Sequence, residues 1–125
     1  MSARILHVED NPANRMIVRD LLEFQGYQVV EISNGEEALA AAERERPDLI
    51  LMDIQLPRIS GLEASRRIKA REDLRRIPII AVTSFALSGD DQRAAAAGCD
   101  AYIAKPYRPR ELLQLIKSLL PPDLH

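Results

Sequence analysis

The sequence has few cysteines and no long apolar run, the features that would indicate an oxidising compartment or a membrane. Cys99 is its only cysteine, so no disulfide can form within the chain. No apolar run approaches the roughly 18 residues of a membrane span, and the run near the N-terminus is too short for the core of a signal peptide. We therefore expect a cytoplasmic protein that does not associate with membranes.

An excess of charge of one sign is also absent. The 17 basic and 19 acidic side chains leave a net charge of -2, which gives no indication of a nucleic-acid surface. Hydrophobic residues make up 46% of the 125 positions, enough to fill the core of one domain. No linker or low-complexity segment is evident, including at the C-terminal end. We expect a single domain over residues 1–125 with no output domain.

Short apolar runs alternate with longer amphipathic patterns along the whole chain. Runs that are apolar on both faces are typical of parallel strands covered by helices on both sides. The alternation predicts a doubly wound, flavodoxin-like (βα)5 sandwich with right-handed crossovers and a parallel sheet of order 2-1-3-4-5. The five predicted strands are residues 5–8, 28–32, 49–53, 77–83 and 101–104.

Capping residues mark where the predicted helices begin. Asn11, followed by Pro12, suits the first turn of a helix. Asn34 and Ser60 each precede a glutamate by three residues, and Ser88 begins a weaker signal of the same kind. Apolar spacing supports the helix that follows Pro12, where three residues share one face: Ile17, Leu21 and Phe24.

Acidic residues stand directly at the ends of two predicted strands. The first strand leads into Glu9 and Asp10, and the third ends in Asp53. These two strands are expected to be neighbours, so the three carboxylates would meet at the carboxyl edge of the sheet, where such folds bind ligands. Like charges packed together either raise their pKa values or attract a cation. Mg²⁺, which takes carboxylates, waters and phosphate oxygens, suits such a site.

Thr83 ends the fourth predicted strand and Lys105 follows the fifth, adding a hydroxyl and a compact positive charge to the same edge. Both groups suit phosphoryl oxygens, and a metal-screened Asp53 could act as a nucleophile that forms an aspartyl phosphate. Each residue alone has an ordinary interpretation as a turn, strand or surface residue. Their shared position at carboxyl strand ends favours a phosphate-handling site.

These residues lie in strings that resemble the receiver domains of response regulators, and the resemblance covers essentially the whole chain. One string alone would be weak, whereas five in the right order are specific. Residues 47–63, together with Phe85-Ala86 and Gly89-Asp90, are most similar to single-domain cell-division regulators of the DivK type. The five strings are Val8-Glu9-Asp10-Asn11-Pro12, Leu51-Met52-Asp53-Ile54-Gln55-Leu56-Pro57, Ser60-Gly61, Ala81-Val82-Thr83 and Tyr102-Ile103-Ala104-Lys105-Pro106.

The resemblance implies a role for each residue of the site. Asp53 would be the phosphoacceptor and Lys105 its ion-pair partner. Mg²⁺ would be held by Asp10, Asp53 and the backbone carbonyl of Gln55. Glu9 stands where an aspartate is commoner, and its extra methylene implies that it reaches the ion through water.

The resemblance also implies a conformational switch. Thr83 would move toward the phosphoryl group, and Tyr102 would follow it by turning inward. The Lys105–Pro106 peptide would be cis, which would aim Lys105 into the site. The domain would sample inactive and active arrangements, and phosphorylation would bias them toward the active one.

The partners implied by the resemblance are proteins. A histidine kinase or histidine phosphotransferase would supply the phosphoryl group, and an effector would bind the face formed by the fourth helix, fifth strand and fifth helix. Leu115 could belong to that face or simply widen the core side of the last helix. We expect a monomer or weak dimer that acts as a switch rather than an enzyme, beyond self-catalysed phosphotransfer and slow autodephosphorylation, and that does not bind nucleic acid.

Three other functions fit parts of the sequence. A flavin-binding electron carrier would need a phosphate loop after the first strand, where Glu9 and Asp10 would repel a phosphate. An aspartyl-nucleophile phosphatase would use a second acid two residues after Asp53, where this chain has Gln55. A receiver module of a larger hybrid histidine kinase or regulator is the nearest alternative. The residues at 121–125, which show no evident linker, slightly favour a complete protein.

Overall fold

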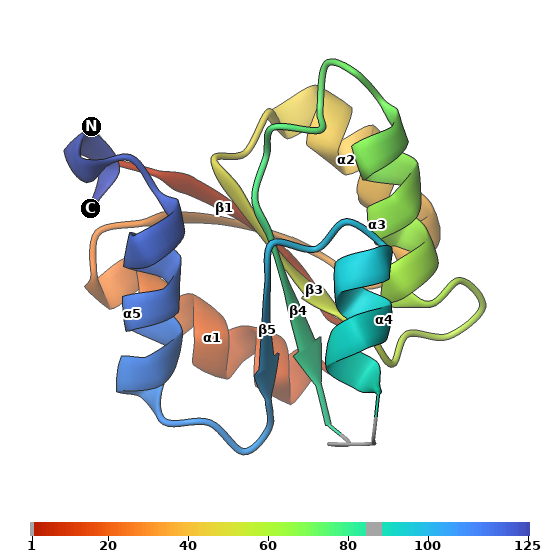
Figure 1. The fold of residues 1–125 in the computed structure, drawn as a ribbon. Coiled ribbons are helices and arrows are strands. Elements are labelled where there is room, and N and C mark those ends of the chain that lie inside the picture. The colour runs from red at the N-terminus through yellow and green to blue at the C-terminus, as the bar shows by residue number, and fades with distance from the viewer. Residues whose placement is uncertain (1, 85–88) are drawn as a thin grey trace.

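The sheet of the computed structural model confirms the predicted topology. Within residues 2–84 and 89–125, the part of the chain that the structure describes, five parallel strands lie in the order β2-β1-β3-β4-β5 (Figure 1). The strands are β1 (Arg4–Val8), β2 (Gln28–Ile32), β3 (Leu49–Asp53), β4 (Ile79–Thr83) and β5 (Ala101–Ala104). The helices are α1 (Pro12–Phe24), α2 (Ala38–Glu45), α3 (Gly61–Ala70), α4 (Asp90–Ala96) and α5 (Pro109–Leu119), with 3-10 turns η1 (Gly35–Glu37) and η2 (Pro122–Leu124).

Strands β1 and β3 are neighbours at the centre of the sheet, as predicted. Val8, the last residue of β1, pairs with Met52 of β3. The chain turns outward from β1 to the edge strand β2, then crosses back to β3 and continues to β4 and β5. The strand order therefore reverses between β1 and β3, which is where doubly wound sheets bind their ligands.

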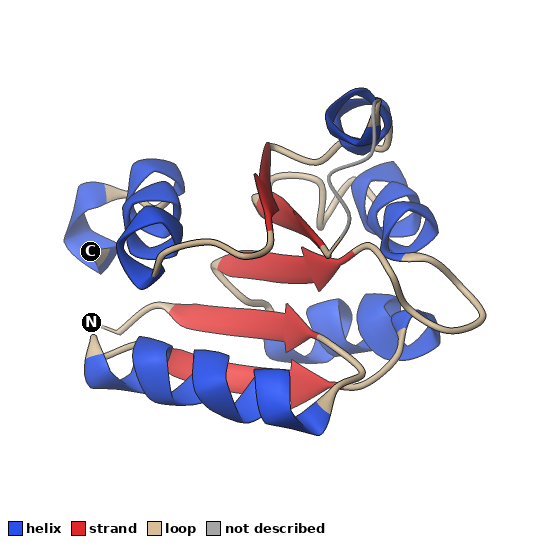
Figure 2. Ribbon diagram, turned by 90° about the horizontal axis from the view of Figure 1, so that it is seen from below, coloured by secondary structure: helices blue, strands red, loops and turns tan. Residues whose placement is uncertain are grey.

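Helices cover both faces of the sheet (Figure 2). Val18 of α1 and Leu112 of α5 belong to one buried cluster, whereas Ala41 of α2 and Ile68 of α3 belong to another on the opposite face. Strand β3 is buried along its whole length and sends alternate side chains into the two clusters. This burial fixes the position of Asp53 at its end.

The capping residues behave largely as predicted. The side chain of Asn11 accepts hydrogen bonds from the backbone N–H groups of Ala13 and Asn14, and Ser60 accepts one from Glu63 at 3.2 Å. Asn34 caps a 3-10 turn, so α2 begins only afterwards. The weaker signal at Ser88 and the Phe85-Ala86 string lie outside the described residues.

The face of α1 that carries Ile17, Leu21 and Phe24 is not the one that packs on the sheet. Val18 and Leu22 are buried against the sheet, whereas Ile17 is 63% exposed and Phe24 is 87% exposed. Leu21, between these two groups, is half-buried. The helix carries two adjacent apolar stripes, and only the one containing Val18 and Leu22 faces the core.

Strand β4 begins at Ile79, two residues later than predicted. Pro78 has no N–H to donate to a neighbouring strand, although its carbonyl oxygen accepts a hydrogen bond from the N–H of Ile50 at 2.9 Å. Because Ile77 is apolar, the predicted strand began two residues before the first residue of β4.

The two ends of the described chain lie side by side, at the amino edge of the sheet (Figure 1). Ser2 and His125 line the same hollow, and the Tyr27 hydroxyl donates to the carbonyl oxygen of His125 at 3.4 Å. Among the described residues, no helix combines the length and the apolar character needed to cross a membrane.

Candidate functional site

Three carboxylates meet at the carboxyl edge of the sheet, as the strand order required. Asp53 ends β3, and Glu9 and Asp10 follow β1. One oxygen from each lies within 4.8 Å of the others. Asp10 is exposed, whereas Asp53 and Glu9 are only 4% and 2% exposed. Two of the three acids are therefore cut off from bulk water. Burial of this kind makes a negative charge costly.

Backbone groups hold the two buried acids in place. The N–H of Gln55 donates to Asp53 Oδ1 at 3.0 Å, and the N–H of Asn11 donates to Glu9 Oε2 at 3.2 Å. The first residue of helix α3, Gly61, packs directly against the backbone of Asp53. A Cβ at position 61 would stand 2.0 Å from the carbonyl oxygen of Asp53. Only glycine permits that approach, which explains the Ser60-Gly61 string.

The two buried acids behave as a pair that shares one proton. Burial, together with the hydrogen bond to Glu9 and the negative charge of Glu9, raises the pKa of Asp53 to about 7. Burial alone would also raise the pKa of Glu9, but hydrogen bonds with Asp53, Lys105 and the Asn11 N–H lower it to about 2. Below about pH 7, the proton therefore resides on Asp53 and the negative charge on Glu9.

Lys105 pairs with Glu9 rather than with Asp53, the partner that the resemblance implied. Its Nζ donates to Glu9 Oε1 at 2.9 Å. The ammonium group meets the carboxylate that carries the charge, since Asp53 retains the proton. The Lys105–Pro106 peptide is cis, as expected from the resemblance.

Thr83 lies at the end of β4, one residue beyond the register partner of Asp53. Its side chain is buried and belongs to a polar network. The Gln55 Nε2 donates to Thr83 Oγ1 at 2.8 Å, and Thr83 Oγ1 lies 3.4 Å from Asp90 Oδ2, at the start of α4. The Gln55 Oε1 also accepts from the N–H of Ser84 at 2.8 Å.

This network contains residues that the sequence analysis missed. Gln55 was considered for its backbone carbonyl and as the residue in place of a phosphatase's second acid, and Asp90 only as part of the Gly89-Asp90 string; neither was considered for its side-chain hydrogen bonds. No pattern in the chain marks an amide side chain that reaches across to the next strand. The alignment of strands that brings Gln55 to Thr83 appears only in the folded structure.

Tyr102 occupies a different place from the carboxylates. It is half-buried in β5 and packs beside Ala94 of α4. On its other side it lines a shallow groove with Gln114 and Leu115 of α5. Leu115 is half-buried and packs against the core, so it contributes both to the core side of α5 and to this groove.

A cavity of about 390 Å³ opens beside the acids, between the sheet and the helices α1 and α5. Its lining includes His7, Val18, Leu21 and Tyr107. His7 is buried, and burial lowers its pKa to about 4, so its ring is neutral at pH 7. Its Nδ1 has no hydrogen-bond partner among the described residues.

Comparison with known proteins places these features in a family context. Residues 5–117 match the family model of the response regulator receiver domain. The chain is 49% identical, over 96% of its length and 98% of the relative's, to the polar-differentiation response regulator DivK of Brucella anthropi. The DivK of Brucella ovis is 48% identical over the same shares.

Solved structures show the same architecture. The receiver domain of the sensor histidine kinase PA1611 of Pseudomonas aeruginosa, which has a magnesium ion in its active-site cleft, superimposes with a TM-score of 0.88 at 42% identity. That match covers 95% of this chain and 98% of the other. The BeF3-activated receiver domain of Klebsiella pneumoniae RstA has a TM-score of 0.86 at 29% identity, covering 92% and 96%.

Proposed function

This chain belongs to the response regulator receiver family, and we propose that it is a phosphorelay switch that accepts a phosphoryl group on Asp53. One observation carries the proposal. A buried aspartate stands at a strand end beside two further carboxylates, with the ammonium group of Lys105 and the hydroxyl of Thr83 at the same edge of the sheet. The phosphoryl donor is a histidine kinase or a histidine phosphotransferase.

The donor set fits a magnesium ion. Without a cation, the acids relieve their crowding by keeping a proton on Asp53, and a hard divalent ion would displace that proton. Asp10, Asp53 and the carbonyl of Gln55 would hold Mg²⁺, with Glu9 acting through water. When bound, Mg²⁺ would neutralise the carboxylates and the oxygens of the incoming phosphoryl group. The PA1611 receiver, which carries magnesium in its cleft, supports this part of the proposal.

The side chains of this protein divide the remaining work. An ionised oxygen of Asp53 attacks phosphorus, a new P–O bond forms, and the bond to the donor nitrogen breaks with its electron pair left on the imidazole. Lys105 leaves Glu9 to pair with a phosphoryl oxygen. Thr83 donates its hydroxyl to another of these oxygens and thereby registers that Asp53 is modified.

The effector binds the face formed by α4, β5 and α5. The groove beside Tyr102 and Leu115 supports this assignment, because it offers apolar and hydroxyl surface on β5 and α5, and Tyr102 also packs beside Ala94 of α4. We propose that the protein acts as a single domain. The DivK relatives support this, since the match covers 98% of their length.

A second candidate is a receiver module of a hybrid histidine kinase. The 42% identity to the receiver of the sensor kinase PA1611 favours it. The chemistry at Asp53 is the same in both cases, and the next protein in the relay differs. Mixing the phosphorylated chain with a purified histidine phosphotransferase separates them, because rapid onward transfer is expected only of a relay module.

Intact-mass measurement tests the proposal. The protein is incubated with Mg²⁺ and acetyl phosphate, beside Asp53→Asn and the matched control Asp20→Asn, an exposed aspartate of α1. We expect a gain of about 80 Da, one phosphoryl group, in the wild type and the control. The gain should require Mg²⁺ and be lost in Asp53→Asn. A wild type that gains no mass and does not bind beryllofluoride would overturn the phosphorylation proposal.

A further inference from the structure

The side chain of Gln55 joins the phosphoacceptor loop to the end of β4. We propose that it is a positioning residue that holds Thr83 in the resting arrangement and must release it when Asp53 is phosphorylated. The proposal rests on the function proposed above and adds a residue to it. It assigns to Gln55 a side-chain role that is separate from its backbone carbonyl.

The orientation of the Gln55 amide follows from its neighbours. The backbone N–H of Ser84 can only donate, so the atom that faces it at 2.8 Å must be the oxygen Oε1. The nitrogen Nε2 is then directed at Thr83 Oγ1, also at 2.8 Å. Gln55 therefore donates to the Thr83 hydroxyl and accepts from the next residue along the chain, fixing two consecutive residues at once.

The contacts of the Thr83 hydroxyl conflict with its proposed task. A hydroxyl has one proton to donate, and here Thr83 Oγ1 lies 3.4 Å from the carboxylate of Asp90 while it accepts from Gln55. Thr83 is fully buried, so a polar contact that it gives up is not readily replaced by bulk water. To donate to a phosphoryl oxygen on Asp53, Thr83 must turn its proton away from Asp90. The Gln55 amide holds the hydroxyl oxygen at 2.8 Å, so it opposes any movement of that oxygen toward Asp53.

Gln55 is also in direct contact with the phosphoacceptor. Its backbone N–H donates to Asp53 Oδ1 at 3.0 Å, so one residue touches both Asp53 and the switch residue. A phosphoryl group on Asp53 alters the hydrogen bond that the Gln55 N–H makes with Asp53. The side-chain amide of the same residue, only a few bonds away, is the group that holds Thr83. This arrangement links modification to release without any contribution from residues distant from the site.

A beryllofluoride titration tests the role of Gln55. Half-saturation is followed through the backbone amide signal of residue 83 in two-dimensional NMR, at fixed Mg²⁺, for wild type, Gln55→Met, Thr83→Val and the double variant. Methionine keeps the length of the side chain but cannot donate to Thr83. Gln55→Ala, which lacks the whole side chain, serves as a second variant because Gln55 is only half-buried.

If Gln55 restrains Thr83, both Gln55 variants should bind beryllofluoride more tightly, by about three- to tenfold, the factor expected for one neutral hydrogen bond. In the Thr83→Val background, Gln55→Met should have no further effect, because the hydroxyl is already gone. A merely structural role would not produce this dependence on Thr83.

Two results would overturn the proposal. Unchanged or weaker beryllofluoride binding by Gln55→Met would mean that the side chain does not oppose the active arrangement. An equal effect with and without the Thr83 hydroxyl would mean that Gln55 acts elsewhere. Both require a wild type that saturates with beryllofluoride, whereas a wild type that does not bind it contradicts the proposed function itself.

Discussion

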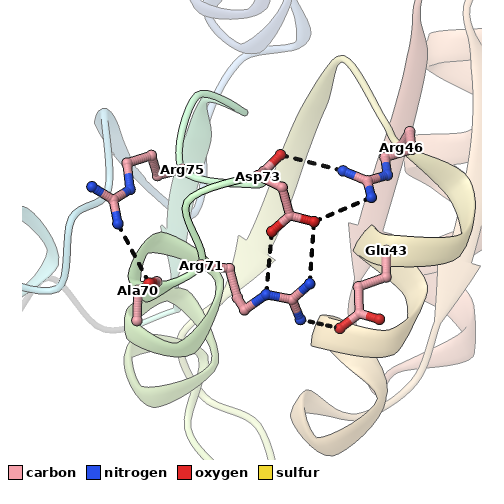
Figure 3. Close-up of polar contacts among 6 residues, drawn as sticks. All are labelled: Glu43, Arg46, Ala70, Arg71, Asp73 and Arg75. Atoms are coloured by element: carbon pink, nitrogen blue, oxygen red, sulfur yellow. Dashed lines mark hydrogen bonds and ion pairs between the residues drawn. The ribbon is translucent and has the colours of Figure 1, made fainter.

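Charged side chains gather at both edges of the sheet, and the two groups differ in balance and burial. At the carboxyl edge, Glu9, Asp10 and Asp53 face one ammonium group, and two of the acids are buried. At the opposite edge, where α2 and α3 end, Arg46 and Arg71 lie around Asp73 (Figure 3), and Arg71 also pairs with Glu43. The second group has as many cations as anions, and its side chains are accessible to water.

The pKa shifts follow this difference. The Glu43 carboxylate raises the pKa of Arg71, and Arg71 and Arg46 lower the pKa of Asp73 although desolvation opposes this. Arg71 and Asp73 are thus each held in the charged form. In the site, the pKa of Asp53 rises to about 7 while that of Glu9 falls to about 2. An unbalanced buried cluster thus keeps one acid neutral until a cation arrives, which is typical of a functional site.

The largest effect is expected from removing the ammonium group of Lys105, which pairs with Glu9. Lys105→Met leaves the Glu9 carboxylate without its ion pair and the phosphoryl oxygens without a positive charge. We expect phosphorylation of Asp53 by acetyl phosphate to slow by about 100-fold, the usual cost of losing one charged or dipolar contact to the reacting group. Intact mass against time measures the rate.

Lys117→Met, which removes an exposed lysine of α5, is the matched control and should leave the rate unchanged. A Lys105→Met rate within about threefold of wild type would show that Lys105 does not contribute to phosphoryl transfer.

The second prediction concerns stability without metal. The pKa of Asp53 is raised from 3.8 to about 7 in the folded protein. Its contribution to stability is therefore full below pH 3.8 and is lost as pH rises toward 7, because only the unfolded chain ionises freely. Asp53→Asn cannot ionise and should be more stable than wild type by about 1–3 kcal/mol near pH 8 in EDTA.

Urea unfolding followed by circular dichroism measures the difference. The two proteins should converge below about pH 3, where Asp53 is largely protonated in either state. A stability difference that is the same at both pH values would mean that the proton on Asp53 is not its cause.

Mg²⁺ binding should release a proton in a pH-dependent way. Near pH 6, Asp53 is mostly protonated, so holding the ion requires it to lose about one proton. Near pH 9 the proton has already gone, and we expect almost no release. A pH indicator in weak buffer, during a Mg²⁺ titration, reports both values. Equal release at the two pH values would contradict a proton shared between Asp53 and Glu9.

The smallest effect is expected at the exposed cluster. Asp73→Asn removes the acid shared by Arg46 and Arg71, but these side chains are accessible to water and exposed ion pairs contribute little to stability. The urea midpoint should change only slightly, and the rate of phosphorylation not at all. A marked loss of phosphorylation in this variant would mean that the two edges of the sheet are coupled.

The fold could be predicted because its signals are local and repeated. Short strands that are apolar on both faces, alternating with capped helices, leave few topologies open, and the order β2-β1-β3-β4-β5 is the one observed. The sequence could not indicate which of two apolar stripes of α1 packs on the sheet. The Ile17 stripe of α1 is as apolar as the buried stripe beside it, and only contact with the sheet decides which one is covered.

The site could be predicted as a set of residues, but not as a set of contacts. Strand ends brought the three acids together as expected. The sequence could not indicate that Lys105 would select Glu9, because that choice depends on which acid keeps the proton in the folded site. It also gave no indication of the Gln55 side chain, whose partners come from a strand that follows it by more than twenty residues.

The adjacency of the two chain ends has a practical consequence. Ser2 and His125 share a hollow at the edge of the sheet opposite Asp53. A short flexible linker could therefore close the backbone into a ring, and new termini could be opened at an exposed turn of that same edge. Fluorescent reporters attached at the ends would sit together on one pole of the molecule and leave the other pole free for a docking partner.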